Sequence, residues 1–196
     1  MWGYGRKILL SNDNVSVVIP ALNEPKLGCF LVKLKDYGVD VRTEKGLSYA
    51  VWRGIQESKS EVIVVLDGDG SHPIEAIPKM INCLDEENWL VVGSRYCRGG
   101  YSDDSVLRKI VSLIYCSIAR IMLRTKIRDP MSGFWIGYRE AFNFKPSKTY
   151  KFGLQLIRKH KKHIVEYPII FEKRKSGKSH VKPLQAIKDL LAIFCV

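Results

Sequence analysis

The sequence lacks the cysteine pattern of a disulfide framework or a zinc site. Its five cysteines are scattered over 196 residues, and no two of them form a CxxC pair. This spacing argues against a zinc ribbon and a redox dithiol as the basis of function. We expect reduced cysteines that pack inside the protein, as is usual in the cytoplasm. They are Cys29, Cys83, Cys97, Cys116 and Cys195.

Long apolar runs are also missing. No stretch reaches the ~18 uninterrupted apolar residues of a membrane span, and the best candidate, 106–123, is interrupted by Arg108, Lys109 and Arg120. Residues 1–7 (MWGYGRK) do not contain the apolar segment of a signal peptide. We therefore expect a soluble, cytoplasmic protein whose membrane contact, if it has one, is peripheral and on the cytoplasmic face.

Acidic residues are few relative to basic ones. The chain has 32 Lys and Arg against 20 Asp and Glu, which gives a formal net charge of +12 at pH 7. A positive field attracts anions such as nucleotide phosphates, nucleic acid or an acidic membrane surface. Basic side chains also serve solubility alone, so the charge by itself leaves the partner open.

Strand and helix patterns alternate along the first half of the chain. Apolar runs predict strands at 15–19, 39–41, 61–66 and 89–93, and helical spacings predict helices at 26–37, 47–58 and 74–84. This alternation is typical of βαβ units, so we predict a Rossmann-like α/β fold with a mostly parallel central sheet flanked by helices.

The second half of the chain has a less regular pattern. An amphipathic helix is predicted over 106–123, a strand over 164–171 and a terminal helix over 184–196. The stripe of the first helix contains Leu107, Ile110, Ile114, Ile118 and Ile121. No linker or change in composition divides the chain, so we expect one domain.

Asp67-Gly68-Asp69 follows the clearest predicted strand. Open α/β sheets bind ligands beyond the carboxyl ends of their strands, and two carboxylates around a glycine suit Mg²⁺ or Mn²⁺ when phosphate oxygens complete the coordination. Asp and Gly are also ordinary turn residues. The residues around this loop are needed to decide between a metal site and a surface turn.

Six segments in and around this loop stand out along the chain. They are VSVVIPALNE (15–24), KGLSYA (45–50), DGDGSHPIEAI (67–77), GSRY (93–96), DPMSGF (129–134) and FEKRKSGKSHV (171–181). Together they resemble family 2 glycosyltransferases, most closely the dolichyl- or polyprenyl-phosphate mannose synthases, in a shortened form. The matches occur in the family's order from about residue 15 to residue 183, and their joint order is more specific than any one of them.

The resemblance implies a GT-A fold and an inverting transfer by single displacement. The donor would be a GDP- or UDP-linked sugar, the acceptor a lipid phosphate, a glycan or a protein, and the cofactor Mn²⁺ or Mg²⁺. It also divides the single domain 1–196 into a nucleotide- and metal-binding half (about 15–100), an acceptor-side half (about 101–183) and the amphipathic helix 184–196. It leaves the oligomeric state open and implies no specific nucleic-acid partner.

The resemblance also implies roles for individual residues. Asp67 and Asp69 would bind the metal, Asp129 would act as base or orient the acceptor, and Arg174 would contact phosphate in catalysis. The expected nucleotide-sugar residues are Pro20, Ala21, Asn23, Glu24, Lys45, Gly46, Asp67, Gly68, Asp69 and Arg95. The expected acceptor-side residues are Arg108, Ser132, Gly133 and Ser179.

Two departures from the family pattern concern the donor side. The Asp-Asp-Gly-Ser signature is absent between Glu24 and Lys45, which predicts a deleted or shortened strand–helix unit and leaves Asp40 and Glu24 as the nearby acids. Ser71 stands where mannose synthases often have a Gln beside the metal. His72, before Pro73, is expected to support the metal site rather than bind the ion, because imidazole is not a preferred Mg²⁺ ligand.

Other functions remain open at the sequence level. Basic clusters such as 173–175 would suit a nucleic-acid-binding module, a DxD-like pair also occurs in nucleotidyltransferases, and a degenerate relative would bind without catalysis. The stripe Leu184, Ile187, Leu191 and Phe194, after the basic stretch 173–182, would suit either packing on the sheet or a membrane interface.

Overall fold

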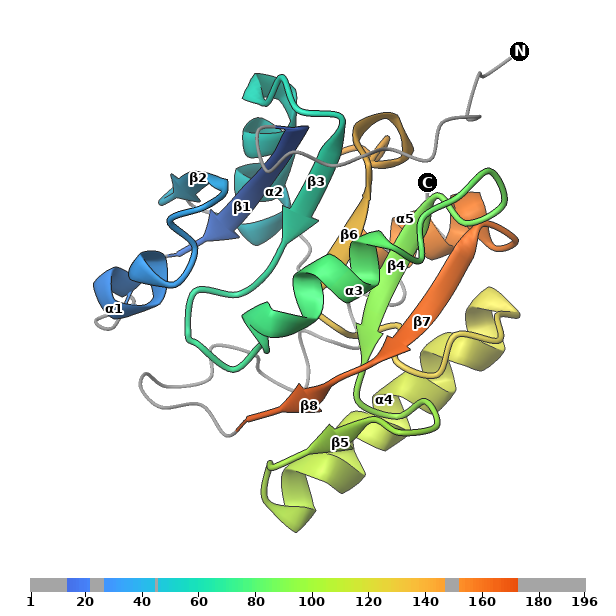
Figure 1. The fold of residues 1–196 in the computed structure, drawn as a ribbon. Helices are drawn as coiled ribbons and strands as arrows, with labels where there is room; N and C mark the ends of the chain where they lie inside the picture. The colour runs from blue at the N-terminus through green and yellow to red at the C-terminus, as the bar shows by residue number, and fades with distance from the viewer. Residues whose placement is uncertain (1–13, 22–26, 45, 147–151, 173–196) are drawn as a thin grey trace.

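A computed structural model describes residues 14–21, 27–44, 46–146 and 152–172 of the chain. They form a six-stranded sheet in the order β2-β1-β3-β6-β4-β7 (Figure 1). β6 is antiparallel to both of its neighbours, and the other pairs are parallel. The strands are β1 (Val15–Pro20), β2 (Gly38–Arg42), β3 (Val62–Val65), β4 (Leu90–Ser94), β6 (Trp135–Tyr138) and β7 (Ile164–Pro168).

Helices cover both faces of this sheet. α2 and α5 lie on one face and α3 on the other (Figure 1). A short second sheet pairs β5 (Tyr101–Ser102) with β8 (Ile170–Phe171) in parallel. The helices are α1 (Leu27–Val32), α2 (Leu47–Glu57), α3 (Ile77–Ile81), α4 (Val106–Leu123) and α5 (Phe152–His160), with 3-10 turns η2 (Ile74–Ala76) and η3 (Arg139–Ala141).

The apolar run of β3 is continuous because both of its faces are buried. Ile63 and Val65 pack into the core on the α2 and α5 side, whereas Val62 and Val64 pack into the core on the α3 side. Successive strand residues point to opposite faces, so a strand between two helical layers needs apolar residues at every position. The predicted α/β sheet is confirmed.

Three predicted elements differ from the structure. α1 ends at Val32 rather than Tyr37, because the amides of Leu34 and Tyr37 donate to carbonyls three residues back, in turns. The helix expected over 74–84 is a 3-10 turn followed by α3. The strand expected over 164–171 breaks after Pro168, and its two parts, β7 and β8, join different sheets.

The helix expected over 106–123 is confirmed as α4, but its apolar stripe does not face the core. Leu107 and Ile121 are 72% and 76% exposed, and the helix packs inward through Cys116, Ala119 and Leu123. β6 and α5 have no counterpart among the predicted elements. The helix expected over 184–196 lies outside the described residues.

Candidate active site

The acidic loop lies where two parallel strands end. β1 and β3 are adjacent and parallel, so Ala21 and Asp67 follow them at the same edge of the sheet. A Cβ added at Gly68 would lie 3.1–3.2 Å from side-chain carbons of Ile19, Ala21 and Leu27. Only glycine fits this contact without a shift of its neighbours, so it lets the acidic loop pack against Ala21, one of the predicted nucleotide-sugar residues.

The segment before β6 approaches the same loop from the other side. β6 is antiparallel to β3, and Trp135 is paired with Val65, so residues 129–134 arrive at this edge of the sheet. A Cβ added at Gly133 would lie only 2.6 Å from Oδ2 of Asp67. The Asp67 carboxylate is therefore held against the backbone at Gly133.

Ser132 fixes the position of that segment. Its hydroxyl donates to the Gly93 carbonyl at 2.6 Å and accepts from the Phe134 amide at 3.2 Å. Ser132 is buried. These hydrogen bonds tie the 129–134 segment to the end of β4. Of the two predicted acceptor-side residues Ser132 and Gly133, only Gly133 borders the Asp67 carboxylate.

Asp69 and His72 complete the acidic loop. Oδ1 of Asp69 accepts hydrogen bonds from the amide and the hydroxyl of Ser71, at 3.0 and 2.5 Å. Nε2 of His72 lies 3.3 Å from Oδ2 of Asp67, and its ring packs between Phe134 and Phe171. This geometry fits the expected supporting role of His72, because a ring fixed by two aromatic neighbours orients the carboxylate beside it.

The carboxylate oxygens of the loop suit a divalent cation such as Mg²⁺ or Mn²⁺ when a phosphate ligand completes the coordination. The Asp67 side chain is 38% exposed, whereas Asp69 is buried. Within the described residues, no three His, Cys, Asp or Glu side chains gather as a metal cage. Mg²⁺ and Mn²⁺ favour oxygen donors, and Mg²⁺ is usually held by one or two carboxylates, with substrate phosphates completing the coordination.

Arg95 and Asp129 form a buried ion pair close to the Gly133 segment. Nε and Nη2 of Arg95 donate to the two carboxylate oxygens of Asp129 at 2.7 and 2.9 Å, and the Arg95 amide donates to Oδ2 at 3.0 Å. Burial opposes the charge of Arg95, yet the Asp129 carboxylate raises the pKa of the guanidinium above its ordinary value. Both predicted site residues are therefore engaged with each other.

Three further contacts hold this pair in place. Oε1 of Glu166, on β7, accepts from the amides of Arg128 and Asp129 at 2.9 and 3.0 Å. Sγ of Cys116, on α4, lies 3.6 Å from Oδ1 of Asp129. The Arg95 guanidinium lies 5.3 Å from the centroid of the Phe171 ring. Sequence reasoning missed Glu166, which sits inside an apolar strand pattern and gave no signal of its contacts.

A second ionic cluster joins β2 to α2, in the half of the chain predicted to bind the nucleotide sugar. Arg42, at the end of β2, donates to Asp40 at 2.7 Å and to Glu57 of α2 at 2.5 Å. The Arg42 guanidinium lowers the pKa of the Glu57 carboxyl. Gly46 precedes α2 with a φ of 102°, a conformation that favours glycine. In the described residues, one helix and one strand (α1 and β2) lie between β1 and α2.

The remaining predicted residues lie away from the acidic loop or outside the residues that the structure describes. Arg108 lies in the exposed first turn of α4, with its guanidinium 3.7 Å from Oδ1 of Asp104. Five predicted residues lie outside the described part of the chain. They are Asn23, Glu24, Lys45, Arg174 and Ser179.

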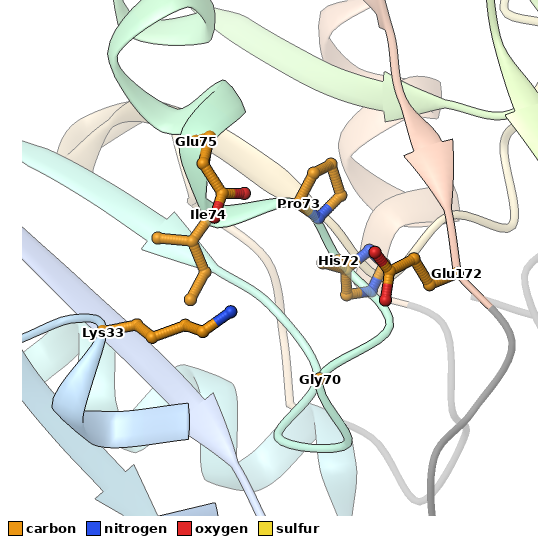
Figure 2. A pocket seen from close by; sticks show the side chains of 7 residues that line it. All are labelled: Lys33, Gly70, His72, Pro73, Ile74, Glu75 and Glu172. Atoms are coloured by element: carbon orange, nitrogen blue, oxygen red, sulfur yellow. The ribbon is translucent and has the colours of Figure 1, made fainter. Parts of the chain in front are cut away.

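A small pocket of about 80 Å³ adjoins the acidic loop. Figure 2 shows Lys33 reaching across it toward Ile74, with Glu172 beside His72 on the other side. Ligand pockets for drug-sized molecules usually measure about 300–1,000 Å³. This pocket therefore has room for only a fragment of a nucleotide sugar.

Comparisons with known proteins place the sequence among transferases. A family model described as "Glycosyl transferase family 2" matches residues 30–144. A dolichol-phosphate mannosyltransferase of Pyrococcus furiosus is 36% identical over 145 residues, covering 71% of this chain and 41% of that protein. The dolichol-phosphate mannosyltransferase of Saccharomyces cerevisiae is 35% identical over 173 residues, covering 76% of this chain and 62% of that protein. The chain thus spans less than two thirds of these relatives.

Solved structures share the fold at low sequence identity. Glucosyl-3-phosphoglycerate synthase from Mycobacterium tuberculosis, in complex with Mn²⁺, UDP-glucose and phosphoglyceric acid, has a TM-score of 0.64 and 18% identity, covering 92% of this chain and 79% of that one. Mannosyl-3-phosphoglycerate synthase from Rubrobacter xylanophilus has a TM-score of 0.62 and 12% identity, covering 94% and 72%. The predicted GT-A fold is confirmed.

Proposed function

This chain belongs to glycosyl transferase family 2, and from that premise we propose that it transfers a sugar from a nucleoside-diphosphate sugar to a polyprenyl phosphate. Relatives that are 31–36% identical are named dolichol-phosphate or undecaprenyl-phosphate mannosyltransferases, which makes mannose the sugar of choice. The chain covers only part of each relative, so the proposal is argued from the site as well.

The observation that carries the proposal is the position of Asp67 and Asp69. They follow β3 at the carboxyl edge of the sheet, and Asp67 is partly exposed against Gly133. We assign Asp67 and Asp69 as the residues that would hold Mn²⁺ or Mg²⁺ against the donor diphosphate. When bound, the ion neutralises charge that develops on the leaving diphosphate. A structural neighbour whose title names Mn²⁺ and UDP-glucose supports this choice of cofactor.

The pairing of Asp129 favours a phosphate acceptor over a hydroxyl acceptor. A hydroxyl needs a base to remove its proton, but both carboxylate oxygens of Asp129 accept hydrogen bonds from Arg95. A polyprenyl phosphate is already ionised at neutral pH and needs no base. Its oxygen would attack the anomeric carbon as the bond to the diphosphate breaks, in a single displacement that inverts the configuration.

With a phosphate acceptor, Asp129 positions Arg95 rather than removing a proton. Arginine matches phosphate geometry, so Arg95 is assigned to the phosphates at the edge of the site, with Glu166 holding the Asp129 segment through two amides. Gly133 leaves room for the Asp67 carboxylate. Arg108 and Ser179 stay predictions for the acceptor side, and Arg174 stays a predicted catalytic phosphate contact. The predictions for the donor side are Pro20, Ala21, Asn23, Glu24, Lys45 and Gly46.

A transfer assay tests the proposal. The purified chain is incubated with Mn²⁺, dolichyl phosphate and either GDP-mannose or UDP-glucose, and the glycolipid is detected by mass spectrometry. We expect glycolipid from wild type and none from Asp67→Asn. Nucleotide binding without transfer to any acceptor would indicate a degenerate relative, and transfer to a free sugar alone would contradict the phosphate acceptor.

A further inference from the structure

Phe171, the last residue of β8, lies between the two halves of the candidate site. Its ring centroid is 5.2 Å from that of His72, at an interplanar angle of 70°, and the guanidinium carbon of Arg95 lies over the ring at 5.3 Å. His72 contacts the Asp67 carboxylate at 3.3 Å. Arg95 donates to Asp129 at 2.7 and 2.9 Å. One aromatic ring therefore packs against the side chain that holds each of these carboxylates.

The backbone around β8 fixes the position of this ring. The amide of Glu172 donates to the carbonyl of Ser71 at 3.0 Å, which ties the end of the strand to the acidic loop. Figure 2 shows Glu172 beside His72. The carbonyl of Phe171 accepts from the amide of Asp103 at 2.9 Å, next to the parallel pairing of β8 with β5. Hydrogen bonds to two different segments thus hold Phe171 at the edge of the site.

Both contacts of Phe171 depend on an aromatic side chain. The electron-rich face of a ring attracts a cation such as a guanidinium, and two rings favour the edge-to-face arrangement that Phe171 and His72 adopt. Phe171 is half-buried and the Arg95 side chain is only 12% exposed, so little water weakens the contact between them. An aliphatic side chain of similar size would fill the same space without either attraction.

We propose that Phe171 is a positioning residue that couples the metal-binding loop to the Arg95–Asp129 pair. A displacement of its ring moves Arg95 on one side, and on the other side it moves His72 and the Asp67 carboxylate that His72 orients. The inference rests on the proposed function, because it takes Asp67 as a metal ligand. It goes further by assigning to β8 the connection between the two halves of the site.

A double-mutant cycle separates this coupling from simple space filling. Proximity alone does not demonstrate coupling, whereas a cycle measures whether two changes act independently. Phe171→Leu removes the ring and keeps an apolar side chain. Arg95→Lys keeps the positive charge opposite Asp129 but loses the planar guanidinium that stacks on a ring. The two changes therefore remove the same contact from its two ends.

Calorimetry of GDP binding with Mn²⁺ tests the proposal in wild type, the two single variants and the double variant. We expect each single variant to bind GDP about threefold more weakly or worse. The loss in the double variant should be smaller than the product of the single losses by about threefold or more. Phe171→Tyr keeps the ring and should restore wild-type affinity. The matched control is Phe144→Leu, because it removes a ring 5.4 Å from that of Phe152 in the core, and it should bind GDP as wild type does.

Several results would overturn the proposal. Single losses that multiply in the double variant mean that Phe171 and Arg95 act independently. Unchanged binding by Phe171→Leu, or an equal loss in Phe171→Tyr or Phe144→Leu, means that the ring at this position has no special role. A wild type that binds GDP but transfers no sugar contradicts the proposed function alone, and one without Mn²⁺-dependent binding contradicts both. Phe171→Met replaces Phe171→Leu if that variant fails to fold.

Discussion

At the residue scale, the candidate site is built by glycines that let charged groups approach backbone. Gly68 lets the acidic loop pack on the end of β1, and Gly133 leaves room for the Asp67 carboxylate. His72 orients the Asp67 carboxylate at 3.3 Å, and the Ser71 hydroxyl orients that of Asp69 at 2.5 Å. The identity of these neighbours decides where the oxygens of Asp67 and Asp69 lie.

Gly133→Ala tests this close approach. The added Cβ would lie 2.6 Å from Oδ2 of Asp67, so the carboxylate must move. A misplacement of about 1 Å at a reacting centre can reduce the rate on the order of 100-fold, and we expect such a loss in the transfer assay with the melting temperature nearly unchanged. Gly38→Ala, whose Cβ would have only ordinary contacts at 3.5–3.6 Å, should transfer normally. Normal transfer by Gly133→Ala would contradict the placement of Asp67.

Asp129→Asn tests the buried ion pair. The substitution leaves the Arg95 guanidinium buried without its counter-ion, and removing one partner of a buried pair costs about 3–5 kcal/mol. Urea denaturation should show that loss in the free energy of unfolding. Arg53→Gln, which removes the exposed pair with Glu57 at 2.6 Å, should change it by about 1 kcal/mol or less. Losses of the same size in both variants would argue against a tightly held Asp129.

At the element scale, the sequence predicts what periodicity can encode. The sequence predicts β1, β3, β4 and α2, because the apolar residues of each element form a continuous run or a helical spacing over several positions. β6 was not, because Trp135–Tyr138 is four residues long and contains Gly137, which reads as a strand breaker. In the structure a Cβ at Gly137 would lie 2.5 Å from Cδ2 of Leu90, so the glycine is required by a neighbouring strand.

The orientation of α4 was also beyond the sequence. An apolar stripe predicts a buried face when the partner is the protein core, but periodicity does not say which partner covers the stripe. The α4 side chains that pack inward are Cys116, Ala119 and Leu123, and only leucine among them is large. The larger apolar side chains of α4 face outward.

The packing of α2 on β1 gives a prediction for this scale. A Cβ added at Gly54 would lie 2.5 Å from Cγ1 of the buried Val18. Overpacking a core costs about 1–3 kcal/mol, and the better helix propensity of alanine returns about 1 kcal/mol. We expect Gly54→Ala to lower the free energy of unfolding, whereas Gly28→Ala in α1, with nothing within 4 Å of its Cβ, should not. A more stable Gly54→Ala would contradict this contact.

At the scale of the whole molecule, the site joins segments that are distant in sequence. Arg95 and Asp129 are 34 positions apart, and Glu166 is 37 positions from the amide of Asp129 that it accepts from. Motif order predicted that these regions belong to one site, through resemblance to a family. It did not predict that Arg95 and Asp129 bind each other, because that depends on how β4, β6 and β7 meet.

Global stability should depend on pH through His160. Burial first, and then the charge of Lys159, lower the pKa of this histidine below its ordinary value. His160 therefore binds a proton more readily in the unfolded chain than in the folded one. As a result, the free energy of unfolding falls as pH drops from 7 through the unfolded pKa of about 6.5. The slope is at most about 1.4 kcal/mol per pH unit. His160→Phe should flatten the stability profile between pH 7 and 5, and an unchanged slope would assign it to other groups.

The central claim is that Asp67 and Asp69 hold a divalent ion against the diphosphate of the donor. Calorimetry of GDP and UDP binding, with Mn²⁺ and with a chelator, tests it most directly in wild type, Asp67→Asn and Asp36→Asn. We expect Mn²⁺ to raise wild-type affinity at least about tenfold, a gain of about 1.4 kcal/mol. Asp67→Asn should lose that gain, and Asp36→Asn, at an exposed turn, should keep it. Equal wild-type affinity with and without the ion would contradict the claim.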